Sequence, residues 1–290
     1  MFVGSVQFSE RMLRVLLDMK ADIVGVVCKE TIASDTDQVG LDEICSKHGV
    51  SFIKTDNVNS ANVINQIVAW RPDVIFCMGW SQIFSRALLS IPVAGVIGYH
   101  PSLLPRNRGR HPIIWPLALG LDKTGSTFFY IDEGVDSGDI IDQQVVKLDA
   151  ECNASNLYDR LLDVAENQLR EFFPLLEQGK APRLPQNHGD ATYWRKRTVS
   201  DGLIDWRLST RTLINLVRAL DRPYCGAHFF RQENRIVVWR VERIKGALPD
   251  QEPGKVLDIA SDGIVVKVGD GALKVIDYSG SIEVKVGDYL

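Results

Sequence analysis

The chain lacks the cysteine patterns of a disulfide framework or a zinc site. Its five cysteines are odd in number and scattered, and none belongs to a C-x-x-C pair: Cys28, Cys45, Cys77, Cys152 and Cys225. Disulfide-rich domains and structural zinc sites use short, regular cysteine spacings. We therefore predict reduced, mostly buried thiols and no metal site.

Long apolar runs and a surplus of positive charge are also missing. No apolar run is long enough to span a bilayer, and residues 1–8 lack the basic and apolar regions of a secretory signal. The formal net charge is -4, whereas binding of a phosphate backbone normally needs clustered, surplus Lys and Arg. The sequence thus predicts a cytoplasmic protein with no membrane partner, and it disfavours a nucleic acid as substrate.

The glycine fingerprint of dinucleotide-binding proteins is absent as well. The first strand-to-helix turn, residues 3–9, contains a single glycine, Gly4, where the G-x-G-x-x-G motif needs three. This turn argues against a nicotinamide cofactor.

The sequence does contain a regular alternation of short apolar runs and segments of helical periodicity. Through the first 78 residues these segments alternate between strand and helix, starting with a strand: 2–6, 10–19, 23–27, 41–48, 51–54, 58–70 and 74–78. Such alternation forces parallel strands with helices on both faces. We predict an α/β fold with a doubly wound, mostly parallel sheet, whose ligands bind beyond the carboxyl ends of the strands.

The 290 residues suffice for one large domain and a smaller one. Apolar residues at helical spacing predict a helix over residues 153–178 that closes the first domain. The chain then becomes polar, and a helix around 210–220 is followed by short β-rich runs separated by turns. We predict a first domain over 1–180, a linker over 181–202, and a small OB-like antiparallel β-barrel over 203–290.

Two segments are the most informative about chemistry. Residues 95–109 read GVIGYHPSLLPRNRG, and residues 127–141 read TFFYIDEGVDSGDII. In this order and at this separation they resemble the motifs of the folate-dependent formyltransferase family, which includes methionyl-tRNA formyltransferases, glycinamide ribonucleotide transformylases and bacterial nucleotide-sugar N-formyltransferases. Residues 202–206 and 218–220 are similar to the start of the second domain in the tRNA and sugar branches. The resemblance covers nearly the whole chain and implies a Rossmann-like formyltransferase fold.

This resemblance implies transfer of a formyl group from N10-formyltetrahydrofolate to a primary amine, with no metal. His100 follows an apolar run, and a carboxylate at Asp136 can orient an imidazole and favour its charged form. By the resemblance, His100 moves a proton and stabilises the oxyanion, while Asp136 fixes His100 and helps to transfer a proton. Taken alone, a histidine at this position would more often be structural.

By the same resemblance, two segments enclose the pterin ring of the folate. One is the Asp- and Gly-rich loop, whose small residues let main-chain groups approach a ligand, and the other follows the strand at 74–78. The residues assigned to cofactor binding are Met78, Gly79, Trp80, Asp132, Glu133, Gly134, Val135 and Gly138. Taken alone, the loop could be a solvated turn, and Met78 and Trp80 could be core residues.

Residues near His100 are assigned to the acceptor substrate. Guanidinium groups suit phosphate or carboxylate recognition, although a basic run can also be merely solvated. A serine in this position is expected to orient the loop rather than to act as a nucleophile. The assigned residues are Tyr99, Ser102, Arg106, Arg108, Arg110 and His111.

One position departs from the family pattern. The family has Asn two residues before the histidine, and this chain has Gly98. Loss of one preorganised donor typically lowers the rate about a hundredfold to a thousandfold, unless a group such as Tyr99, His111 or a backbone N–H replaces it. A non-catalytic protein that binds folate or a nucleotide sugar is therefore an alternative function.

The sequence leaves the acceptor amine open between branches. A second domain argues against the glycinamide ribonucleotide branch, which ends after the first domain. The basic cluster at 195–197 is a small electrostatic footprint for tRNA, and residues 108–112 and 126–129 resemble the sugar branch more closely. We expect a nucleotide-linked amino sugar as acceptor, with methionyl-tRNA as the alternative, and a homodimer as the assembly.

Overall fold

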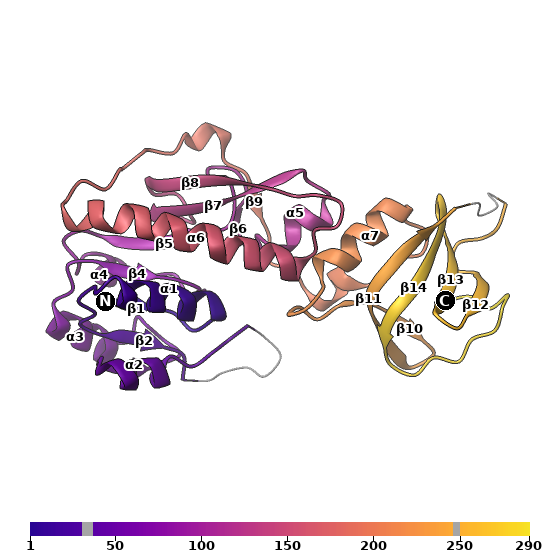
Figure 1. The fold of residues 1–290 in the computed structure, drawn as a ribbon, viewed down its shortest axis with the longest axis horizontal. Coiled ribbons are helices and arrows are strands. Elements are labelled where there is room, and N and C mark those ends of the chain that lie inside the picture. Colours follow the sequence, from indigo (N-terminus) through magenta and orange to yellow (C-terminus); the bar gives the residue numbers. More distant parts are fainter. Residues whose placement is uncertain (31–36, 246–249) are drawn as a thin grey trace. The chain divides into compact units, whose positions relative to one another are not determined.

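The computed structural model describes residues 1–30, 37–245 and 250–290. The chain divides into two compact units, each with its own β-sheet (Figure 1). The first unit comprises Met1–Pro112, Thr124–Val146 and Asp159–Trp194, and the second comprises Ile113–Lys123, Lys147–Tyr158 and Arg195–Leu290. Residues 181–194, which the sequence presents as a linker, are therefore part of the first unit.

Among the described residues, the main sheet of the first unit has seven strands in the order β3-β2-β1-β4-β5-β7-β8. The first five strands in this order are parallel, and β7 pairs with β5 in antiparallel register. The mostly parallel sheet predicted from the sequence is thus confirmed. Its strands are β1 (Phe2–Val3), β2 (Val26–Cys28), β3 (Phe52–Lys54), β4 (Ile75–Cys77), β5 (Val96–His100), β7 (Lys123–Tyr130) and β8 (Ile140–Lys147).

Helices cover both faces of this sheet because each presents an apolar stripe to it. On one face, Phe8 of α1 stacks on Tyr99 of β5, and Phe172 of α6 packs against Phe128 of β7. Figure 1 shows the long helix α6 running beside the sheet. On the other face, Val63 and Ile67 of α3 join a core formed by strand residues. The helices are α1 (Gln7–Asp18), α2 (Asp42–His48), α3 (Ala61–Trp70), α4 (Arg86–Leu89) and α6 (Ala154–Glu177).

The alternation of side chains along β5 decides which of its residues can reach a ligand. Successive side chains of a strand point to opposite faces. Tyr99 packs with Phe8 of α1 on one face, and its neighbours Gly98 and His100 therefore lie on the opposite face. Of the last three residues of β5, Tyr99 therefore belongs to the core beneath α1, whereas Gly98 and His100 lie on the face that carries α3.

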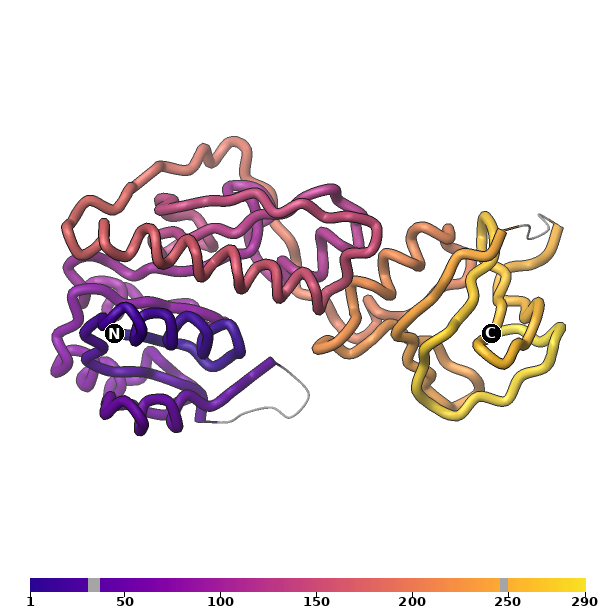
Figure 2. Tube along the Cα trace, viewed as in Figure 1, coloured from indigo at the N-terminus to yellow at the C-terminus, as the bar shows by residue number. Residues whose placement is uncertain are grey.

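After α6 the chain returns across the first unit to the loop that follows β5. Figure 2 traces this return as a continuous tube between α6 and β9. Strand β9 (Tyr193–Trp194) pairs in parallel with β6 (Arg108–Gly109), and the 3-10 helix η1 (His188–Asp190) lies between α6 and β9 in the sequence. Leu184 also exchanges two main-chain hydrogen bonds with Ile140 at the start of β8. We call residues 184–194 the strap.

The second unit is built on an antiparallel sheet in the order β10-β11-β14-β13-β12, which confirms the predicted antiparallel β domain. Trp206 packs edge-on against Phe229 in its core. Its elements are α5 (Ile114–Ala118), η2 (Val199–Gly202), α7 (Thr210–Ala219), β10 (Ala227–Arg231), β11 (Asn234–Ile244), β12 (Val256–Ala260), β13 (Gly263–Val268) and β14 (Gly271–Ser279). In the described parts of both units, no helix combines the length and apolarity needed to cross a bilayer.

Packing of α1 on the sheet gives a direct test of the fold. Leu16 is completely buried in α1, whereas Val68 of α3 is half exposed. Leu16→Ala should lower the free energy of unfolding by about 2–5 kcal/mol, because a cavity adds to the lost apolar burial. Val68→Ala should change it by less than about 0.5 kcal/mol. Urea denaturation followed by circular dichroism measures both, and equal losses would contradict the packing described.

Candidate active site

A pocket of about 450 Å³ opens in the first unit beyond the carboxyl ends of β4 and β5. Its position agrees with the rule that ligands of open α/β sheets bind outside the carboxyl ends of the strands. Four segments of the chain line it: Cys77 with Gly79–Phe84, Gly98–His100, Gly109–Pro112, and Phe129 with Ile131, Asp132 and Gly134–Asp136. The two sequence motifs therefore converge on one cavity.

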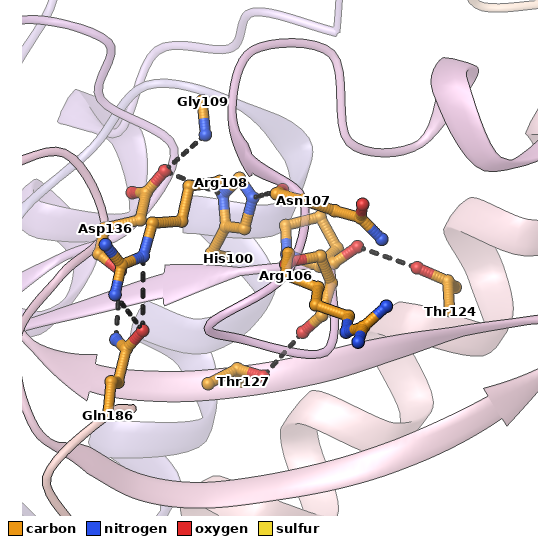
Figure 3. A network of polar contacts seen from close by, with 11 residues as sticks. His100, Arg106, Asn107, Arg108, Gly109, Thr124, Thr127, Asp136 and Gln186 are labelled. Carbon is orange, nitrogen blue, oxygen red and sulfur yellow. Dashed lines mark hydrogen bonds and ion pairs between the residues drawn. The ribbon is translucent and has the colours of Figure 1, made fainter. Parts of the chain in front are cut away.

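His100 lies between the two loops that the motifs form. Its Nε2 is 2.8 Å from the carbonyl oxygen of Asn107, and its Nδ1 is 3.5 Å from Oδ2 of Asp136. The same Oδ2 accepts a hydrogen bond of 2.8 Å from the main-chain N–H of Gly109. Figure 3 shows the imidazole ring with Asp136 on one side and Asn107 on the other.

These contacts determine where the imidazole carries its hydrogen. A carbonyl oxygen can only accept, so Nε2 must donate to Asn107, and in the neutral ring Nδ1 is then unprotonated. A bare Nδ1 facing a carboxylate has no hydrogen to share, whereas one extra proton satisfies both groups. The pair can therefore take up one transferable proton, either as imidazolium with carboxylate or as imidazole with carboxylic acid.

Asp136 is the more accessible member of this pair. Its side chain is 21% exposed, compared with 6% for His100. The backbone of Asp136 has a φ of 50°, and Asn107 and His111 have φ values of 64° and 58°. Residues other than glycine rarely adopt this left-handed region, and such strain gathers where function requires it.

The loop after β7 depends on small residues at two positions. A Cβ added to Gly138 would collide with the carbonyl oxygen of Tyr130, and one added to Gly134 would collide with Oγ of Ser137. Asp132 accepts hydrogen bonds from the N–H of Gly134 and from the hydroxyl of Ser137. The loop is thus a built turn that brings Asp136 to the pocket.

The residues assigned from the sequence to folate binding divide into two groups. Gly79, Trp80, Asp132, Gly134 and Val135 line the pocket. Met78 is completely buried in the core, Glu133 forms an exposed ion pair with Arg86, and Gly138 shapes the loop from behind. These last three are not among the pocket-lining residues.

Arg110 and His111, which the sequence assigns to the acceptor, line the pocket together with Tyr99. The Tyr99 ring, however, stacks on Phe8, and its hydroxyl accepts from Ser126. Burial raises the pKa of the Tyr99 phenol well above its usual range. Its side chain is accordingly a core group and does not replace a donor at position 98.

The other three assigned residues lie outside the pocket lining. Ser102 is buried and donates to the carbonyl oxygen of Arg106, which agrees with a loop-orienting role. The Arg106 side chain is exposed. Arg108 is only 1% exposed and bonds to Gln186 of the strap, so it is unavailable to a phosphate of the substrate.

Sequence reasoning missed several residues of the pocket wall at the end of β4 and after it, among them Cys77 and Gln82. Gln82 accepts a hydrogen bond from the main-chain N–H of Val58 and donates one to the side chain of Asn57. Burial raises the pKa of the Cys77 thiol to about 12, which removes it as a nucleophile at neutral pH. The sequence signal that could have identified these residues was their position at or after the end of a predicted strand. Within the described chain, no group of three or more His, Cys, Asp or Glu could hold a metal ion.

The space beside Gly98 is occupied. A Cβ built on Gly98 would lie 2.8 Å and 2.9 Å from two side-chain carbons of Ile131 and 3.2 Å from the ring of Phe129. Real Cβ atoms essentially never come closer than 3.0 Å to a neighbour, as this one would to the two carbons of Ile131. The volume that an Asn side chain would need at position 98 is thus taken up by Ile131.

This crowding leads to a prediction for Gly98→Asn. The variant should lose about 1–3 kcal/mol of unfolding free energy because it overpacks the pocket wall. In a protein that already carries Ile131→Ala, Gly98→Asn should lower the unfolding free energy by less than it does in the wild type. Thermal unfolding of the four proteins measures the coupling, and strictly additive losses would show that Ile131 does not compete for this space.

Two family models match the chain. One, described as formyl transferase, matches residues 4–172, and the other, described as formyl transferase, C-terminal domain, matches residues 196–286. The chain is 33% identical to the methionyl-tRNA formyltransferase of Alkaliphilus oremlandii (strain OhILAs), over all of this chain and 94% of that protein.

Solved structures share the fold. WlaRD, described as a sugar 3N-formyl transferase crystallised with dTDP and 5-N-formyl-THF, superposes with a TM-score of 0.71 at 16% identity, covering 96% of each chain. The N-formyltransferase from Helicobacter canadensis, in complex with folinic acid and dTDP-3-aminofucose, also gives 0.71, at 15% identity over 96% of this chain and 98% of that chain. With both motifs on one pocket and both family models matched in order, this chain belongs to the formyl transferase family.

Proposed function

We propose that the chain transfers a formyl group from N10-formyltetrahydrofolate to the primary amine of a nucleotide-linked amino sugar. The observation that carries the proposal is the His100 and Asp136 pair at one pocket, held at 3.5 Å in a protein of the formyl transferase family. Structural relatives crystallised with 5-N-formyl-THF and with folinic acid support a folate co-substrate.

The reaction needs three things from the protein. The attacking amine must be neutral, its proton must be accepted, and negative charge that develops on the formyl oxygen must be stabilised. The amine loses one proton, and the folate nitrogen that leaves gains one. Asp136 and His100 together can take up the proton that the amine loses and then give it to the leaving nitrogen. The protonation state of the pair is then the same after the reaction as before it.

Exposure assigns the two roles within the pair. Asp136 is the more accessible group and accepts the proton of the amine, while the buried His100 ring shares that proton through Nδ1. Because Nε2 is held by the Asn107 carbonyl, the ring cannot rotate away during the transfer. His100 in its charged form also supplies positive charge next to the developing oxyanion.

The pocket walls suit a flat heterocycle. Gly79 and Gly134 leave main-chain groups accessible from two sides, and Trp80 and Val135 add apolar surface. We assign the pterin ring to this part of the pocket. Arg110, whose side chain is exposed at the pocket rim, is then placed to pair with a phosphate of the acceptor.

The contacts of the basic residues near the strap support a sugar acceptor over tRNA. Arg195 forms an ion pair with Asp201, and this bond holds the pKa of the Asp201 carboxyl far below its usual range. Arg197 is buried and donates to the main chain of residue 201. Arg183 stacks on Tyr130 at 3.5 Å and bonds to a carbonyl oxygen. These cations are already engaged within the protein and offer little to a phosphate backbone.

Methionyl-tRNA is the second candidate acceptor. The observation in its favour is the 33% identity with a methionyl-tRNA formyltransferase across the full length of this chain, together with 30% identity over the same length to that of Clostridioides difficile (strain 630). This sequence identity extends over both domains of the chain. The sugar-modifying structures, at 16% and 15% identity, are similar in fold alone.

The acceptor is decided by offering both classes to the same protein. Purified enzyme is incubated with N10-formyltetrahydrofolate and either dTDP- or UDP-linked amino sugars or initiator methionyl-tRNA, and products are detected by mass spectrometry. Formylated nucleotide sugar supports the proposal. Formylation of tRNA alone selects the second candidate, and tight folate binding without any product selects the non-catalytic alternative that Gly98 raises.

The proton-transfer pair makes a prediction that does not depend on the acceptor class. His100→Asn and Asp136→Asn should each lower kcat by about a hundredfold to ten-thousandfold, the range of positioned acid–base catalysis. Folding and tetrahydrofolate binding should persist, because neither replacement needs more volume than the residue it replaces. Wild-type turnover in either variant would refute the assignment.

The two exposed arginines of the basic run form a matched pair of tests. Arg110 lines the pocket and Arg106 does not. Arg110→Ala should raise KM for the nucleotide-linked acceptor about tenfold or more, the value of a hydrogen bond to a charged group. Arg106→Ala should leave KM within about twofold. A similar change in both variants would show that only the overall charge matters.

A further inference from the structure

The strap contains a buried amide that contacts both catalytic loops. Gln186 is 6% exposed. Its Nε2 donates to the carbonyl oxygen of Asp136 at 2.9 Å and to that of Gly138 at 2.7 Å. Both side-chain hydrogens of the amide are thereby used on the loop that carries the catalytic carboxylate.

The oxygen of the same amide is used on the other loop. Oε1 of Gln186 accepts from Nη2 of Arg108 at 2.6 Å and from its Nε at 3.2 Å. Figure 3 shows these two contacts beside Asp136. The remaining contacts of the buried guanidinium are the Tyr193 hydroxyl and Nδ1 of His188, both from the strap.

The residues on either side of Arg108 are those that hold the catalytic pair. Asn107 offers its carbonyl oxygen to Nε2 of His100, and Gly109 donates its N–H to Asp136. One side chain in the strap therefore fixes the backbone of Asp136 directly. Through Arg108 it also restrains Asn107, which contacts His100, and Gly109, which contacts Asp136.

Backbone strain explains why such support is needed. Asp136 and Asn107 have φ values of 50° and 64°, and residues in this region persist only where their surroundings determine them. Gln186 holds the carbonyl of Asp136, while Thr192 of the strap accepts from the N–H of Asn107 and donates to its side chain. The strap thus contacts each of these two strained residues.

We propose that Gln186 is a positioning residue for formyl transfer, which sets the geometry between His100 and Asp136 by joining their two loops. The expected effect on kcat rests on the proposed function. The expected effect on the geometry of His100 and Asp136 does not depend on it. The strap itself has other anchors, since Leu184 pairs with Ile140 and β9 pairs with β6, and a variant at Gln186 is therefore expected to fold.

The experiment compares three variants of the full chain. Gln186→Met keeps the volume and removes every hydrogen bond of the amide. Gln186→Glu keeps the acceptor for Arg108 but cannot donate to the two carbonyl oxygens when ionised. Asn187→Ala is the control, because Asn187 is the adjacent, exposed strap residue and bonds only to Gly189 and Asp190.

The expected kinetic result is a selective loss of kcat. Displacement of catalytic groups by about 1 Å can cost on the order of a hundredfold in rate. Gln186→Met and Gln186→Glu should lower kcat about 10- to 100-fold, with KM for donor and acceptor within about threefold of wild type. Asn187→Ala should stay within about twofold. Unchanged kcat in Gln186→Met, or a parallel loss in Asn187→Ala, would overturn the proposal.

A second readout needs no turnover. The ring nitrogen signals of His100 in 15N-labelled protein report its contacts with Asn107 and Asp136. They should move in both Gln186 variants and stay in place in Asn187→Ala, while circular dichroism remains unchanged in all three. Absence of transfer by the wild type with either acceptor would reject the proposed function only. Unmoved His100 signals in Gln186→Met would reject the positioning role only.

Discussion

The contact on which the site depends is the carboxylate of Asp136 accepting the main-chain N–H of Gly109 while it faces His100. It joins a loop that follows β5 to a loop that follows β7, although the two come from separate stretches of sequence. Without this contact, each segment would be a glycine-containing turn beside a sheet. With it, an imidazole and a carboxylate face each other beside a cavity. The buried Arg108 and the strap surround the contact and limit its freedom to move.

The fold follows from local patterns, and much of the site does not. Alternating apolar runs and helical periodicity suffice to predict the parallel sheet, because each pattern reflects only which face of one element is buried. The convergence of His100 and Asp136 does not follow in the same way, because β7 runs antiparallel to β5 and its last residue, Tyr130, pairs with Ile97 rather than with His100. The sequence resemblance was needed to select these two from other polar residues.

Side-chain direction and distant partners explain what the sequence left out. Tyr99 lies between two pocket residues, and the two-residue repeat of a strand turns it into the helix-covered core. From the sequence, Arg108 is interpreted as a surface cation, but its acceptors Gln186 and Tyr193 come 78 and 85 positions later. Ile131 fills the space that an Asn at position 98 would occupy. Each of these features depends on tertiary contacts that no local pattern encodes.

The return of residues 184–194 to the catalytic loops has a practical consequence for dissecting the protein. The family model for the first domain ends at residue 172, and α6 ends at Glu177. A fragment cut at either point would lose all the partners that the described residues provide for the Arg108 guanidinium, namely Gln186, His188 and Tyr193, and would leave this charge without them. The smallest piece of chain that retains these contacts around His100 and Asp136 therefore extends through Trp194.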